Sequence, residues 1–223
     1  MASGPKPAKR HLSLSPTGLN YFFHSIVENP MKNIANFLFE AGMLKRTPRT
    51  GFQFLGSGTE SVAEHIFRTS LIGYTLAQMD GEVDVSRVVM LCLFHDIPEA
   101  RTGDLNYVNK KYCKVDESKA VEDLAKTLPF GDDYREIQTE FMSKQSREAQ
   151  IAHDADQLEM ILALKEYKDL GNRYADEWYP ATFKRLQTDT ARQLAETIWM
   201  TDSTRWWFDD DQEWWVKGSR DEE

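Results

Sequence analysis

Two histidines and two aspartates, well separated along the chain, have the side chains that bind a divalent transition metal. They are His65, the adjacent pair His95-Asp96, and Asp156. Imidazole nitrogens and carboxylate oxygens suit a borderline divalent ion, and four such ligands leave coordination positions open for water and substrate. Neighbouring residues on a helix point about 100° apart, so the adjacent pair can share an ion only if other ligands come from different helices. The set therefore indicates a metal site if several helices bring these residues together; the alternatives are a histidine in the apolar core and a His-Asp pair that occurs by chance.

The first half of the chain has helical patterns that would position these residues. Residues 34–44 have apolar side chains at the i, i+3, i+4 and i+7 spacing of an amphipathic helix. Residues 45–58 contain one proline and three glycines, which is typical of a loop. A Ser-x-x-Glu capping box at residues 61–64 begins a second helix, which carries His65 and runs to about residue 79.

A third helix is expected after Asp84, which can cap it, and this helix reaches His95 and ends or kinks at Pro98. Further helical patterns lie at residues 116–128, 132–144, 146–170 and 175–201. No segment shows sustained alternation of apolar and polar residues between hairpin turns, so the sequence does not predict strands. The sequence predicts an all-α fold.

Of the 223 residues, 41% are apolar, enough for one substantial core. We expect one domain at residues 31–200. Residues 1–30 contain four prolines and predict an extension with one short helix around residues 21–27. Residues 201–223 form an acidic tail with eight acidic and three basic residues and four of the six tryptophans, Trp206, Trp207, Trp214 and Trp215. These rings are more typical of a cover over the domain or a partner subunit than of a lid over a site.

Composition excludes several classes of function. The net charge of −9 and a pI near 5.1 argue against a broad basic surface for nucleic acid. The longest apolar run, residues 88–94, is far shorter than the roughly 20 residues that cross a bilayer. The N-terminus lacks the apolar segment of a secretory signal, and Cys92 and Cys113 form no disulfide framework. We therefore expect a cytoplasmic protein that binds neither nucleic acid nor membrane.

Three stretches of the sequence together resemble the HD-domain metal-dependent phosphohydrolases. They are Ser-Val-Ala-Glu-His at 61–65, His-Asp-Ile-Pro-Glu-Ala-Arg-Thr-Gly-Asp at 95–104, and Asp-Ala-Asp-Gln-Leu-Glu-Met at 154–160. More narrowly, they are similar to the 5′-deoxynucleotidase group that includes the HD domain-containing protein 2 type. The resemblance spans residues 34–170 and implies a helical bundle with a metal site between helices.

The resemblance implies that one divalent ion, such as Mn²⁺ or Co²⁺, is bound by His65, His95, Asp96 and Asp156. Asp154 is the rival for the last position, but Asp156 matches the family pattern in Asp-Gln-Leu-Glu. Asp154 is then expected to be solvated or to support a ligand. His153 lies three residues before Asp156, on the same face of a helix, and is a candidate to support a ligand.

Two further acidic residues are candidates for catalysis. In similar proteins the position of Glu99 is the catalytic carboxylate, which can accept a proton from water and later protonate the leaving alkoxide. Glu99 lies four residues after His95, on the same side if the helix continues past Pro98. Asp104 corresponds to a family residue implicated in substrate contact or leaving-group chemistry. The alternatives are a surface glutamate for Glu99 and a turn residue for Asp104.

A basic loop before the first histidine is a candidate phosphate site. Residues 44–51 contain Lys45, Arg46 and Arg49 and no acidic residue, in a chain of net charge −9. Arginine has a planar fork of donors that matches phosphate oxygens. The resemblance assigns Arg46 to phosphate and leaves Arg49 in reserve; the alternative is a solvated loop. Thr47 stands where some relatives have tryptophan, which weakens any expectation of sugar or base packing there.

The resemblance implies a homodimer that hydrolyses deoxynucleoside 5′-monophosphates to deoxynucleosides and phosphate. One alternative is a related phosphohydrolase for nucleoside di- or triphosphates, whose longer phosphate tail usually needs a larger chain. A dinuclear oxygenase is disfavoured, because His153 is the only histidine between Asp96 and Asp156. The other alternative is a helical binding module in which a metal only stabilises the fold. Such a module has no need of Glu99 and Asp104 beside the metal.

Overall fold

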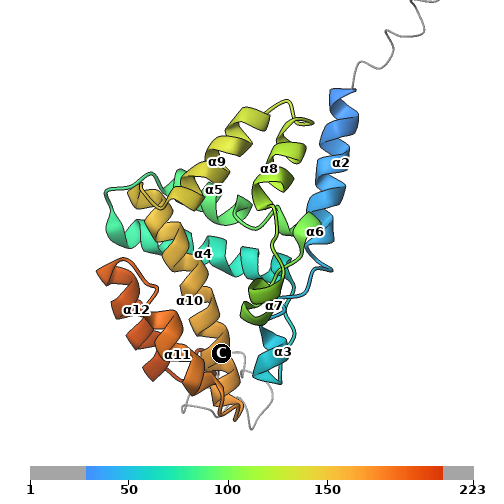
Figure 1. Ribbon diagram of the computed structural model, residues 1–223. Helices are drawn as coiled ribbons and strands as arrows, with labels where there is room; N and C mark the ends of the chain where they lie inside the picture. Colours follow the sequence, from blue (N-terminus) through green and yellow to red (C-terminus); the bar gives the residue numbers. More distant parts are fainter. Residues whose placement is uncertain (1–28, 208–223) are drawn as a thin grey trace, which may run out of the picture.

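The computed structural model describes residues 29–207, in which every regular element is a helix. The helices are α2 (Pro30–Met43), α3 (Phe52–Leu55), α4 (Val62–Asp80), α5 (Val85–Phe94), α6 (Glu99–Thr102), α7 (Tyr107–Tyr112), α8 (Glu117–Ala125), α9 (Gly131–Ser143), α10 (Arg147–Asp169), α11 (Ala175–Phe183) and α12 (Asp189–Met200). The all-α prediction is confirmed (Figure 1). The helix expected at 21–27, Trp214 and Trp215 lie outside the described residues.

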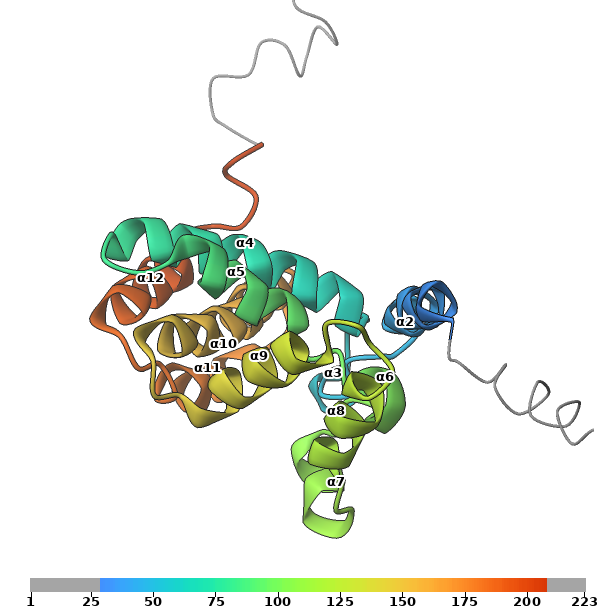
Figure 2. The same cartoon turned by 90° about the horizontal axis from the view of Figure 1, so that it is seen from above.

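The long helix α10 is the centre of the bundle. It contacts α4, α5, α9, α11 and α12, and Figure 2 shows it between α4 and α5 on one side and α11 on the other. Its residues Leu158 and Ile161 are fully buried against Leu76 of α4 and Leu91 of α5. Burial of such side chains contributes about 2 kcal/mol each, so this core fixes α10 relative to α4 and α5.

The capping box at the start of α4 is present as predicted. The Ser61 hydroxyl accepts a hydrogen bond from the Glu64 amide at 3.2 Å, and the Glu64 carboxylate accepts one from the Ser61 amide at 2.7 Å. Gly81, with φ of 76°, ends the helix in the left-handed conformation that glycine adopts without strain. His65 therefore lies in the first turns of a helix whose two ends are both fixed.

A second apolar cluster holds the turn that follows α5. Phe37 of α2 stacks on Phe94 with ring centroids 6.5 Å apart and meets Phe130 edge-on at 5.9 Å. The Gln138 side chain donates to the Phe94 carbonyl at 2.6 Å, which replaces the helical partner lost where α5 ends. As predicted, the helix ends before Pro98. Glu99 therefore begins the separate short helix α6.

The helix expected at residues 175–201 is in fact two helices, and a buried carboxylate explains the break. Asp154 is fully buried, and its two oxygens accept hydrogen bonds from the amides of Gln187 and Thr188 at 2.7 and 2.8 Å. Thr188 then caps α12 through the Ala191 amide. Asp154 is therefore not solvated, and it holds the loop between α11 and α12.

Three other features differ from the sequence-based expectations or add to them. Helix α3 lies inside the segment expected to be a loop, and α7 was not expected at all. Trp206 is 85% exposed, so its ring is not part of the core of the domain. Among residues 29–207, no helix has the length and apolar character that crossing a bilayer requires.

We predict that Asp154→Ala lowers the free energy of unfolding by about 3 kcal/mol, because two buried amides lose their acceptor. Urea denaturation measures this, with Glu196→Ala on the exposed side of α12 as the control expected to change stability little. Affinity for Mn²⁺ should stay unchanged in the folded variant. Unchanged stability together with lost Mn²⁺ binding would instead make Asp154 a ligand.

Candidate active site

The structure brings the four predicted metal ligands together from three helical segments. His65 comes from α4, His95 and Asp96 from the turn after α5, and Asp156 from α10. The Nε2 atoms of the two histidines are 3.3 Å apart. An Asp156 oxygen lies 3.2 Å from Nε2 of His65, and an Asp96 oxygen lies 3.0 Å from Nε2 of His95. The donor atoms of His65, His95 and Asp156 all lie within 4.8 Å of one another.

Both imidazoles are oriented through their other nitrogen. Nδ1 of His65 donates to the carboxylate of Glu159 at 2.7 Å, and Nδ1 of His95 donates to the Cys92 carbonyl at 2.7 Å. These bonds assign the proton of each neutral ring to Nδ1 and leave the Nε2 lone pairs facing the shared space. Such support is typical of metal-binding histidines.

Glu159 is itself held by an arginine. It is fully buried, and one of its oxygens accepts two hydrogen bonds from the Arg68 guanidinium, at 2.6 and 3.0 Å. Burial raises the pKa of Glu159, but its bond to His65 and the charges of His65 and Arg68 outweigh burial and bring it to about 2. The carboxylate is therefore ionised near neutral pH and can accept the Nδ1 proton of His65.

The electrostatics of the cluster favour a positive charge. Burial and the charge of Arg49 lower the pKa of His65, but hydrogen bonds to Asp156 and Glu159 outweigh them and raise it to about 10. Burial raises the pKa of Asp156, yet its bond to His65 and the histidine charges hold it well below its usual range. A divalent cation would satisfy the same carboxylates, so two imidazole nitrogens and two carboxylates fit an ion such as Mn²⁺ or Co²⁺.

A second group of acidic and imidazole atoms lies on the other side of His65. One atom each of Glu60, His65 and Glu159 also lie within 4.8 Å of one another. There, however, Nδ1 of His65 already donates to Glu159, and Arg68 occupies the other oxygen of Glu159. This group is therefore a support for His65 and a poorer fit for an ion.

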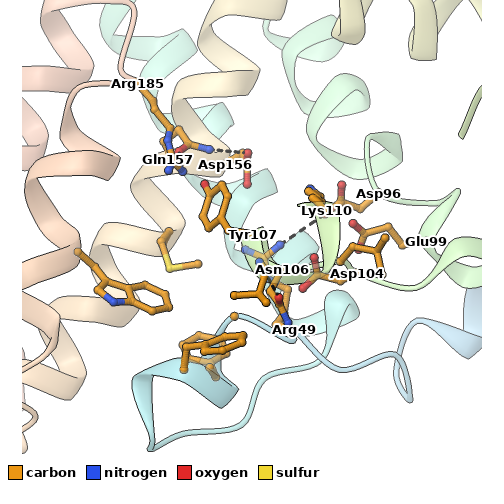
Figure 3. A pocket seen from close by; sticks show the side chains of 17 residues that line it. Arg49, Asp96, Glu99, Asp104, Asn106, Tyr107, Lys110, Asp156, Gln157 and Arg185 are labelled. Atoms are coloured by element: carbon orange, nitrogen blue, oxygen red, sulfur yellow. Dashed lines mark hydrogen bonds and ion pairs between the residues drawn. The ribbon is translucent and has the colours of Figure 1, made fainter. Parts of the chain in front are cut away.

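A pocket of about 390 Å³ opens over the two aspartates (Figure 3). The histidine side chains are buried, whereas Asp96 and Asp156 are 18% and 22% exposed and line the pocket. The pocket joins a charged region to an apolar one. Its charged lining includes Arg49, Glu99, Asp104, Lys110 and Arg185, and its apolar lining includes Phe52, Phe54, Tyr107, Met160 and Trp178. This combination suits a ligand with an anionic group and a ring system.

Of the two candidate arginines, only Arg49 lines this pocket. Its side chain is 12% exposed, and its guanidinium lies 3.8 Å from the carboxylate of Asp96. Arg46 is exposed and lines a separate surface depression beside Glu60 and Glu64. A backbone bridge between Pro48 and Ser61, with the Arg49 amide donating to the Glu60 carbonyl at 2.8 Å, fixes this difference.

The two predicted catalytic acids both reach the pocket and differ in their surroundings. Burial and the charges of Asp96 and Asp104 raise the pKa of Glu99 to about 9, and its Oε2 has no hydrogen-bond partner within residues 29–207. A cation beside Asp96 would offset those charges and lower this pKa. Asp104 accepts a hydrogen bond from the Thr50 amide at 2.8 Å, which ties it to the loop of Arg49.

Comparison with known proteins shows the family. The HD domain family matches residues 41–199, more than half of the chain. The chain belongs to the HD domain family. The resemblance on which the sequence analysis rested is therefore confirmed.

Curated relatives of this HD protein cover most of its length. The bovine (Bos taurus) 5′-deoxynucleotidase HDDC2 is 33% identical over 175 residues, which are 75% of this chain and 84% of the relative. The human (Homo sapiens) 5′-deoxynucleotidase HDDC2 is 29% identical over 183 residues, 78% of this chain and 88% of the relative.

Solved structures share the fold of this HD protein. A conserved hypothetical protein from Pyrococcus furiosus has a TM-score of 0.63 and 29% identity, covering 75% of this chain and 99% of its own. A predicted metal-dependent phosphohydrolase from Magnetospirillum magnetotacticum has a TM-score of 0.62 and 22% identity, covering 78% of this chain and 92% of its own. At that identity the second likeness concerns the fold alone.

The sequence analysis missed residues of the HD site that support others. Glu159 lies three residues after Asp156, and this spacing on a helix was a signal that both face the same way. Arg68, three residues after His65, had the same signal. Gln157 donates to the second oxygen of Asp156 at 2.8 Å and gave no such signal. His153 donates to the Phe141 carbonyl at 2.8 Å and stacks on the Phe141 ring, so its hydrogen bond does not support any of the four predicted ligands.

We predict that Glu159→Gln weakens Mn²⁺ binding about 10- to 100-fold, because the amide no longer holds the His65 proton on Nδ1 as a carboxylate does. Calorimetric titration measures the affinity, with Glu166→Gln as a control that alters the exposed partner of Arg68. An affinity unchanged by Glu159→Gln would mean that this hydrogen bond does not support metal binding.

Proposed function

We propose that this HD protein is a metal-dependent phosphomonoesterase that hydrolyses deoxynucleoside 5′-monophosphates. The observation that carries the proposal is that Arg49, Glu99, Asp96 and Asp156 line one pocket, which also has an apolar region. The names of the curated relatives, 5′-deoxynucleotidases, support the same reaction. A pocket of about 390 Å³ lies at the small end of ligand sites and favours a monophosphate over a longer phosphate tail.

In this proposal His65, His95, Asp96 and Asp156 hold one divalent ion. When bound, the ion supplies Lewis acidity, lowering the pKa of water and polarising a phosphoryl oxygen. The protein contributes the orientation of the donors, since Glu159, Cys92 and Gln157 each hold a ligand by a hydrogen bond of 2.7 or 2.8 Å. Such preorganisation means that little rearrangement accompanies the reaction.

Arg49 binds the phosphate in this proposal. Its guanidinium is buried among Asp96, Asp156, Glu159 and Asp104, and these carboxylates raise its pKa although burial lowers it. Its Nε lies 3.8 Å from a Glu60 oxygen, whereas its Nη1 lies 3.8 Å from Asp96 in the pocket lining, so the Nη end of the guanidinium is the end that can reach a ligand oxygen. Arg46, preferred from the resemblance, is exposed outside the pocket and is no longer our choice.

Glu99 handles the proton. Its carboxylate lines the pocket beside Asp96, where it can accept a proton from the attacking water and later give that proton to the O5′ oxygen as the ester bond breaks. Asp104 lines the same wall and holds the Arg49 loop through Thr50, so we assign it a substrate contact.

The binding-module alternative is disfavoured by the buried, unpartnered Oε2 of Glu99. A purely structural metal site has no reason to keep such an acid beside an open pocket. The homodimer, implied by the resemblance, and the cytoplasmic location, expected from the composition, remain proposals. Phe67, Leu71 and Tyr74 are exposed on one face of α4 and could pack against a second copy of the chain. Light scattering would show whether the protein in solution has the mass of a monomer or of a dimer.

We predict phosphate release from deoxynucleoside 5′-monophosphates in Mn²⁺ or Co²⁺, with less from the di- and triphosphates. Glu99→Gln should lower turnover at least a hundredfold, because the amide can neither give nor accept the proton, while metal content stays unchanged. A phosphate-release assay across mono-, di- and triphosphates tests both statements. No release from any nucleotide would favour the binding module, and full turnover by Glu99→Gln would remove Glu99 from the mechanism.

The two arginines form a matched pair of variants. We predict that Arg49→Gln raises KM for the monophosphate at least tenfold, because a charged hydrogen bond to phosphate is lost, whereas Arg46→Gln changes KM less than twofold. Steady-state kinetics at saturating Mn²⁺ gives both values, and circular dichroism checks that each variant is folded. The reverse ranking would return the phosphate role to Arg46.

A further inference from the structure

Asn106 lies in the wall of the pocket, just before α7, and its position is fixed on two sides. It is 7% exposed, and its side-chain oxygen caps α7 by accepting hydrogen bonds from the amides of Val108 and Asn109 at 3.1 and 3.0 Å. Its own amide donates to the Thr50 hydroxyl at 3.0 Å. Figure 3 shows Asn106 close to Asp104 and Arg49.

The side-chain nitrogen of Asn106, Nδ2, has no hydrogen-bond partner among residues 29–207. It is buried, although the residue lines the pocket. The cap settles which end of the amide is oxygen, because two backbone donors point at it and a nitrogen there would have no role. A buried donor without an acceptor destabilises the protein, and ligand sites are where proteins keep such groups.

The neighbours of this donor indicate what it would bind. The Thr50 amide donates to the Asp104 carboxylate at 2.8 Å, and the Thr50 hydroxyl donates to the Asp104 carbonyl at 2.8 Å. Thr50 thereby joins Asn106 and Asp104 in one wall and follows Arg49 directly in the chain. An amide donor beside a carboxylate acceptor matches a hydroxyl group, which accepts one hydrogen bond and donates another.

We propose that Nδ2 of Asn106 donates a hydrogen bond to a sugar hydroxyl of the substrate and so makes Asn106 a specificity-determining residue. The inference rests on the proposed function, because it takes the phosphate to lie at Arg49. In a 2′-deoxynucleoside 5′-monophosphate the only free sugar hydroxyl is the 3′-hydroxyl. Asn106 then selects nucleotides that keep this group.

The test compares two substrates with the same base, a 2′-deoxynucleoside 5′-monophosphate and its 2′,3′-dideoxy counterpart. In the wild type, kcat/KM should favour the deoxy substrate at least tenfold, since the analogue leaves Asn106 unpaired. Asn106→Ser removes Nδ2 and leaves a shorter side chain that still caps helices, so α7 should remain folded. It should lower kcat/KM for the deoxy substrate alone and reduce the preference at least threefold.

Two further variants keep the result interpretable. Asn106→Asp also caps α7 and lacks the donor, so it replaces Asn106→Ser if that variant is unfolded. Asn109→Ser removes an asparagine side chain from α7 outside the pocket lining and should leave the preference unchanged. An equal loss on both substrates in Asn106→Ser, or an unchanged preference, would overturn the inference.

Binding measurements separate this inference from the proposed reaction. Calorimetry on Glu99→Gln gives the Kd of both nucleotides without turnover. The contact is supported if the deoxy nucleotide binds more tightly than the dideoxy nucleotide and if Asn106→Ser abolishes this difference. This holds even if the wild type releases no phosphate. Turnover with an unchanged preference overturns the contact alone, and failure to bind either nucleotide overturns both proposals.

Discussion

The buried hydrogen bond between Glu159 and Nδ1 of His65 is the interaction on which the geometry of the site depends. Because Glu159 and Asp156 lie three residues apart on α10, the helix presents one carboxylate to each nitrogen of the same imidazole. Arg68 compensates the charge of Glu159 in a region from which water is excluded. An unpaired carboxylate would be destabilising there, so Glu159 depends on both His65 and Arg68 as partners.

The scaffold fixes the remaining donors by packing. The cluster of Phe37, Phe94 and Phe130 holds the turn of His95 and Asp96. Its rings come from α2, from the end of α5 and from the residue before α9. As a result the imidazoles of His65 and His95 are buried, and only the partly exposed carboxylates of Asp96 and Asp156 line the pocket. Arg49 and Glu99 complete the pocket from a loop and a short helix, whose backbones are held by hydrogen bonds such as those from the Arg49 amide to Glu60 and from the Glu99 amide to Asp96.

Local features could be predicted from the sequence, and features that depend on distant contacts could not. The start of α4 was predicted because its capping box involves residues 61–64 alone. The break between α11 and α12 was missed because its cause, the carboxylate of Asp154, lies more than 30 residues earlier. Arg46 was preferred over Arg49 because the family resemblance assigned it to phosphate, and the composition of the loop does not say which arginine side chain turns inward. The convergence of the four predicted ligands came from family resemblance, since no local rule brings α4 and α10 together.

Anomalous diffraction from crystals soaked in Mn²⁺ tests the central claim most directly. The account predicts a single manganese peak enclosed by Nε2 of His65, Nε2 of His95 and the carboxylates of Asp96 and Asp156. A peak among Glu60, Nδ1 of His65 and Glu159, or no peak at either group at saturating Mn²⁺, would contradict it.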